Sequence, residues 1–179
     1  MNPAHLHLLV NHLPVIGSIG ALIALVISLF WKSEDFQKAA LVIALVAGLT
    51  AIPAYFSGES AEEVVEDKPG VEEQYIEEHE EAAKIAGIVA VLSGIVAGAG
   101  LLLRERRQTI TVVATVLFVA TAGLMARAGN TGGQIMHPEI RQGSDAGVSE
   151  STSRAEDSEK APVNGEEKSE KGEREEHEE

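Results

Sequence analysis

The sequence contains no cysteine and few aromatic residues. Without cysteine the chain can form no disulfide, thiolate metal site, c-type haem attachment or thiol nucleophile. Charge is also missing over long stretches, and no side chain between residues 13 and 31 is ionisable. At a rise of about 1.5 Å per residue, a helix over that stretch is about 28 Å long, close to the hydrocarbon thickness of a bilayer. The sequence therefore predicts a membrane-spanning helix near the N-terminus.

Four stretches are long and apolar enough to cross a bilayer, and we expect each to form a helix. They are residues 13–31, 39–56, 85–103 and 109–126. The connections after the first and third stretches are short, whereas the connection at 57–84 is long and acidic. The predicted fold class is therefore all-α: an integral membrane four-helix bundle, built from two helical hairpins, over residues 1–142.

The remaining residues, 143–179, differ sharply in composition from the bundle. They are mostly Ser, Glu, Lys, Gly and Ala, with almost nothing apolar to bury. Such a composition is typical of a disordered segment, so we expect an acidic, solvated tail. Because Glu is mixed with Lys and Arg throughout, the tail does not resemble a nucleic-acid-binding segment.

Basic residues indicate the orientation of the predicted bundle. The two short connections carry Lys32, Lys38, Arg104, Arg106 and Arg107. The longer segments on the opposite side have fewer basic residues for their length, so the short connections are expected in the cytoplasm. This predicts a multi-pass protein of a bacterial inner membrane with both termini in the periplasm.

Five of the six histidines fall on one side of this topology. With four crossings, the N-terminal segment, the long connection and the segment after the last span must share a side. The histidines in those segments are His5, His7, His12, His79 and His137. On an unbroken helix His5 and His12 share a face, whereas His7 points elsewhere.

Helical steps from His79 lead along a stripe of small residues, which predicts a face packed against other helices. The stripe is Ala83, Ala86, Gly87, Ala90, Gly94, Ala97 and Gly98. His79 is therefore expected to face the bundle.

Glycines follow the fourth span, and Gly132 and Gly133 come shortly before His137. We expect these glycines to end the helix and to leave backbone N–H groups open to an anion. Arg127 lies about one turn before that expected end, where its guanidinium could also bind an anion.

The pairing of His12-Leu13-Pro14 with Gly132-Gly133 and His137 resembles a group of small, uncharacterised bacterial membrane proteins with four spans. In that group the first span opens on a histidine closely followed by proline, and the last ends in a Gly-Gly turn shortly before another histidine. The resemblance covers roughly residues 4–137. It implies the four-span fold and makes such proteins candidates for b-type haem or electron-transfer partners.

The first functional hypothesis is haem b binding near the outer face, with His12 and His79 as axial ligands and His137 as a substitute for either. Arg127 and the amides of Gly132 and Gly133 would hold the propionates. Such a protein would take part in electron transfer with a membrane or periplasmic redox partner.

Two alternatives use the same residues differently. A bare transition metal could bind to a set drawn from His5, His7, His12, His79 and His137. The chain could also be a structural or accessory membrane subunit with no cofactor, whose only partners are the lipid bilayer and another protein. The sequence shows neither a nucleotide-binding loop nor a catalytic motif, so we do not expect an enzyme.

Overall fold

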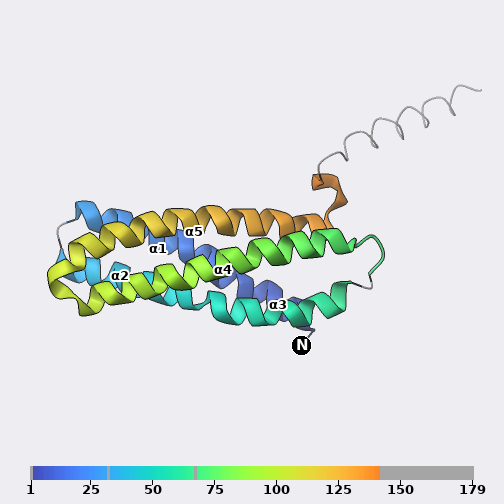
Figure 1. Cartoon of the computed structure of the whole chain (residues 1–179), viewed down its shortest axis with the longest axis horizontal. Coiled ribbons are helices and arrows are strands. Elements are labelled where there is room, and N and C mark those ends of the chain that lie inside the picture. The colour runs from blue at the N-terminus through green and yellow to red at the C-terminus, as the bar shows by residue number, and fades with distance from the viewer. Residues whose placement is uncertain (1, 32, 67, 142–179) are drawn as a thin grey trace, which may run out of the picture. The chain divides into compact units, whose positions relative to one another are not determined.

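The computed structural model describes residues 2–31, 33–66 and 68–141, which lie within one compact unit (Figure 1). These residues are almost entirely helical. In chain order the elements are α1 (Pro3–Phe30), α2 (Glu34–Leu49), α3 (Ala51–Val65), α4 (Glu73–Leu102), η1 (Arg104–Arg106), α5 (Arg107–Met136) and η2 (Pro138–Ile140). Because α2 and α3 follow one path, the described chain forms the predicted all-α four-helix bundle. The predicted tail, 143–179, lies outside the described residues.

The helices pack in a square. α1 packs against α5 and against the rod made by α2 and α3, and α4 packs against the same two neighbours. α1 and α4 therefore occupy diagonally opposite corners. The N-terminus, the connection from α3 to α4 and the end of α5 lie together, and we call this the histidine end (Figure 1). The two short connections form the opposite end, the arginine end. The predicted grouping of the five histidines toward one end is confirmed.

The first helix begins where the sequence predicts a cap. The side chain of Asn2 accepts a hydrogen bond from Ala4 N at 2.9 Å, and Pro3 occupies the first turn, where no N–H is needed. Inward positions then recur every three or four residues: Pro14, Ser18, Ala21, Leu25 and Ser28 are buried. The two serine hydroxyls donate to carbonyls of their own helix, so the inward face contains no unpaired hydroxyl.

The predicted small-residue face of α4 is confirmed, since Ala86, Ala90, Gly94 and Ala97 are all buried. Its tightest contact is with Gly48 of α2. A Cβ added at Gly48 would lie 2.5 Å from the carbonyl oxygen of Ala90 and 2.7 Å from Cα of Gly94. We call this contact the glycine crossing. Only glycine fits here, because the two helix backbones touch each other directly.

Two helix boundaries differ from the prediction. The second span is not one helix, because α2 ends at Leu49 and α3 begins at Ala51. Pro53 explains the break, since it has no N–H to donate to the carbonyl of Leu49. The fourth helix does not end at the glycines either; α5 continues through them to Met136.

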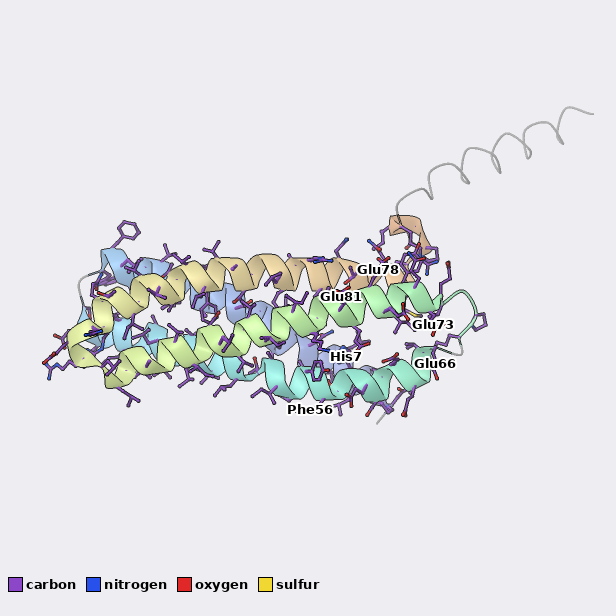
Figure 2. All side chains as sticks on the ribbon, in the orientation of Figure 1. His7, Phe56, Glu66, Glu73, Glu78 and Glu81 are labelled. Atoms are coloured by element: carbon purple, nitrogen blue, oxygen red, sulfur yellow. The ribbon has the colours of Figure 1, made fainter. Side chains whose placement is uncertain are left out.

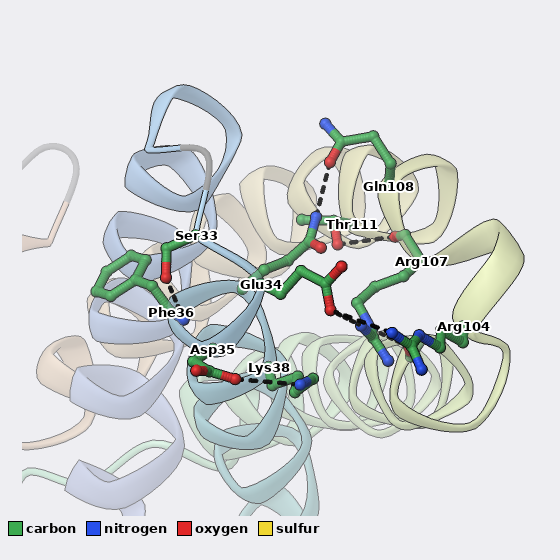
Figure 3. A network of polar contacts seen from close by, with 11 residues as sticks. Ser33, Glu34, Asp35, Phe36, Lys38, Arg104, Arg107, Gln108 and Thr111 are labelled. Atoms are coloured by element: carbon green, nitrogen blue, oxygen red, sulfur yellow. Dashed lines mark hydrogen bonds and ion pairs between the residues drawn. The ribbon is translucent and has the colours of Figure 1, made fainter.

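A polar network closes the arginine end (Figure 3). Arg107 is buried and donates from Nε to the carbonyl of Gly100 at 3.2 Å. A carboxylate oxygen of Glu34 lies 3.9 Å from Nη1 of Arg107 and 3.8 Å from Nη2 of Arg104. The network joins the start of α2 to the start of α5, so both hairpins are tied together at this end.

The outside of the bundle is apolar along most of its length. On α4 alone, Ile88, Leu92 and Ile95 are all more than half exposed. Four helical segments are long and apolar enough to span a membrane, and each corresponds to a predicted span. They are Pro3–Phe30, Glu34–Val65, Glu73–Leu102 and Arg104–Met136.

Candidate functional site

His7 lies on the inward face of α1. It precedes the buried Pro14 by seven residues, which is two helical turns, so both residues point the same way. Figure 2 shows His7 on the inner side of α1, between α3 and α4. The ring is half-buried, and its Nδ1 lies 2.9 Å from Oγ of Ser57 on α3. Ser57 in turn donates to the carbonyl of Ala54 at 2.9 Å.

His79 lies on the inward face of α4, as predicted, and its ring is also half-buried. Its Nδ1 is 3.0 Å from the carbonyl oxygen of Ala128 and 3.4 Å from Oγ1 of Thr131, both on α5. A carbonyl can only accept a hydrogen bond, so Nδ1 carries the hydrogen in this geometry. The lone pair of His79 is therefore on Nε2.

The two rings both lie on inward helix faces at the histidine end. His7 and His79 are close enough to interact electrostatically, although they come from diagonally opposite helices. Within the described part of the chain, both rings make their hydrogen bonds through Nδ1. Both Nε2 atoms thus remain available for a ligand. We call His7 and His79 the imidazole pair.

Gly132 borders this pair in a way that the sequence did not predict. A Cβ at Gly132 would lie 2.9 Å from Cε1 of His79 and 3.1 Å from its Nδ1. Because α5 is helical through Gly132 and Gly133, their amides lie inside the helix and are not open to an anion. The expectation that the helix ends at these glycines and leaves their amides open is therefore wrong. Gly132 instead leaves space for an imidazole ring.

His5 and His12 are exposed, and His12 binds the carbonyl of Leu8 in its own helix through Nδ1. The structure does not bring His12 to the imidazole pair. The reason is angular: His12 precedes the inward Pro14 by only two residues, which places it on nearly the opposite side of the helix. The face predicted for His5 and His12 is thus the outer face.

The other predicted residues also lie apart from the pair. Arg127 is exposed on α5. His137 is exposed at the end of α5, and its Nδ1 lies 2.9 Å from a carboxylate oxygen of Glu139. The pKa of Glu139 lies below its usual value, first because the carboxylate accepts a hydrogen bond from its own backbone N–H and second because of His137.

The predicted metal set is not assembled in one place. Among residues 2–31, 33–66 and 68–141, no group of three or more His, Asp or Glu side chains is arranged to hold a metal ion. The five histidines separate into the inward pair His7 and His79 and the exposed His5, His12 and His137.

The sequence also did not predict the role of Arg141. Its guanidinium bonds Glu72 at 2.8 Å and the carbonyls of Gly70 and Gln134, and it lies 4.2 Å from the ring centroid of Tyr75. Arg141 therefore fastens the connection between α3 and α4 to the last turn of α5. Its only signal in the sequence was a basic residue beyond the last span.

Comparison with protein-family models, curated proteins and solved structures gives no match to this chain. A functional proposal for this chain therefore has only the chain's own geometry to draw on. The central feature of the histidine end is two inward imidazoles, which hydrogen-bond through Nδ1 and, among the described residues, make no hydrogen bond through Nε2.

Proposed function

We propose that this chain is a four-span integral membrane protein of a bacterial inner membrane. The support is its apolar exterior: four helical segments of 28 to 33 residues carry large exposed aliphatic side chains. A water-soluble bundle of this size would carry polar residues on those faces. The basic residues Arg104 and Arg106 at the arginine end favour a cytoplasmic position for that end. The histidine end would then face the periplasm.

We further propose that the imidazole pair binds haem b. The observation that carries this proposal is the free Nε2 on each of two half-buried rings from opposite corners of the bundle. Neutral imidazole is a standard axial ligand, and a histidine ligand usually donates its other ring N–H to a carbonyl or a similar acceptor. Haem needs only two protein ligands, whereas a bare metal ion needs three or more.

Two glycines leave room for the imidazole rings of the pair. Gly58 faces the ring of His7 and Gly132 faces the ring of His79, so each ring borders a position without a side chain. The glycine crossing leaves no space between α2 and α4, so the macrocycle would lie nearer the histidine end, beside α3. When bound there, haem would supply one-electron redox chemistry, and a membrane or periplasmic protein would be the partner.

The test is haem titration of the full chain in detergent, followed by its absorption spectrum. The wild type is expected to give a Soret band and the spectrum of a low-spin bis-imidazole haem. His7→Ala and His79→Ala should each abolish the low-spin spectrum, whereas His5→Ala and His12→Ala, on the exposed face of α1, should retain it. Absence of a Soret band in the wild type would refute the proposal. Loss in His12→Ala with retention in His7→Ala would refute the assigned ligands.

A second candidate is a structural or accessory subunit without a cofactor. The glycine crossing favours it, because direct backbone contact fills the interior between α2 and α4. This function would be supported if the wild type bound no haem and both histidine variants were as stable as the wild type.

A further inference from the structure

Ser57 lies between the ring of His7 and the backbone of α3, the helix to which Ser57 belongs. Its Oγ lies 2.9 Å from Nδ1 of His7 and 2.9 Å from the carbonyl oxygen of Ala54. A serine hydroxyl has one hydrogen to donate and two lone pairs to accept with. If the hydrogen goes to the carbonyl of Ala54, which can only accept, then Oγ must accept from His7.

The His7 ring therefore donates from Nδ1 to Oγ of Ser57. The hydrogen bond made by one ring nitrogen decides which nitrogen carries the lone pair. With the hydrogen on Nδ1, the lone pair is on Nε2.

We propose that Ser57 is a positioning residue that holds His7 in the Nδ1–H tautomer and presents Nε2 as the ligating atom. It does for His7 what the carbonyl of Ala128 does for His79. The two halves of the site differ in one respect. The support of His79 is backbone and cannot be removed by substitution, whereas the support of His7 is a side chain. The tautomer of His7 is a property of the protein without cofactor, and only its consequence for haem rests on the proposed function.

Nitrogen NMR of the ¹⁵N-histidine-labelled chain in detergent, without haem, tests the tautomer directly. In the wild type, His7 and His79 are both expected to show a protonated Nδ1 and an unprotonated Nε2, with His7→Gln used to assign the signals. Ser57→Ala should shift the His7 signals away from the Nδ1–H tautomer and leave those of His79 unchanged. Ser57→Thr keeps the hydroxyl and should restore the wild-type pattern.

Ser60→Ala is the matched control, because Ser60 is exposed one turn along the same helix and does not bond His7. Unchanged His7 signals in Ser57→Ala, or an equal change in Ser60→Ala, would overturn the proposal. Unchanged His79 signals show that the bundle remains folded.

Haem affinity provides the second readout. Residues that orient a metal ligand typically contribute 10–100-fold in affinity, so Ser57→Ala should weaken haem binding by about 10–100-fold, and Ser57→Thr should recover most of it. If the tautomers are as expected but the wild type binds no haem, the role of Ser57 stands and the haem proposal fails. If haem binds and Ser57→Ala changes neither readout, the haem proposal stands and the role of Ser57 fails.

Discussion

Gly132 and Gly58 lie against the two rings of the imidazole pair, but they tolerate a side chain to different degrees. A Cβ at Gly132 would come within 2.9 Å of His79, whereas a Cβ at Gly58 would be 3.6 Å from His7, an ordinary contact distance. The ring of His79 therefore requires glycine at its neighbour and the ring of His7 does not.

Gly132→Ala is expected to push the His79 ring away from the carbonyl of Ala128 and to abolish the low-spin haem spectrum. The helix itself should not suffer, because alanine in a helix interior is favoured over glycine by about 1 kcal/mol. Haem titration, with circular dichroism to follow helix content, measures both effects. Gly58→Ala is the control and should bind haem like the wild type; equal loss in both variants would show that the steric argument is wrong.

Residue-level prediction succeeded where the inward face was marked by a clear pattern. His79 continues a stripe of Ala and Gly, and both the stripe and the histidine face the bundle. On α1 the inward face includes Pro14, Ser18 and Ser28, which hydropathy does not identify as buried. The sequence therefore favoured His12 as the predicted ligand, because His12 is close to Pro14 along the chain. His7, which lies on the same helix face as Pro14, was passed over. The bond from Ser57 to His7 spans 50 positions, and no local pattern predicts it.

At the scale of helices, the sequence located every span but misplaced two boundaries. Glycines often end helices, but α5 passes through Gly132 and Gly133 and continues to pack against α4 there, where Gly132 lies against the ring of His79. Hydropathy averages over a window, so it missed the break at Thr50 within one long apolar stretch.

The glycine crossing gives a prediction about stability. In Gly48→Ala the new methyl group would meet backbone atoms of α4, which cannot move aside as a side chain can. We expect a loss of about 1–3 kcal/mol in the free energy of unfolding, the usual cost of overpacking. Unfolding in mixed detergent, followed by circular dichroism, measures it. Gly87→Ala on α4, where nothing lies within 4 Å, should cost nothing; a wild-type stability for Gly48→Ala would show that the helices can separate freely.

For the whole molecule, the fold was predictable because four long apolar helices joined in sequence have few possible arrangements. Helices satisfy all their backbone groups internally, and four of them must return the chain to the side on which it started. Counting apolar stretches was therefore enough to place five histidines toward one end. The packing order of the helices was not predictable, because it depends on contacts such as the one between Gly48 and Gly94.

The absence of cysteine allows a direct test of topology. Single substitutions Asn2→Cys and Lys68→Cys are expected to react with a membrane-impermeant maleimide added outside intact spheroplasts. Arg106→Cys at the arginine end should react only after the membrane is permeabilised. Reaction of all three from outside would argue against membrane insertion, and opposite sidedness of positions 2 and 68 would rule out four crossings.

The break between α2 and α3 also bears on how a large ligand could enter a bundle that is tightly packed at the glycine crossing. Before Thr50 in the chain, the backbones of α2 and α4 touch at Gly48 and hold these helices together. After Thr50, the helical hydrogen bonding between α2 and α3 is interrupted, because Pro53 has no N–H to donate. Tilting α3 outward about Thr50 would uncover His7 and leave the glycine crossing intact. The joint at Thr50 thus separates the glycine crossing from the end of the bundle that carries His7.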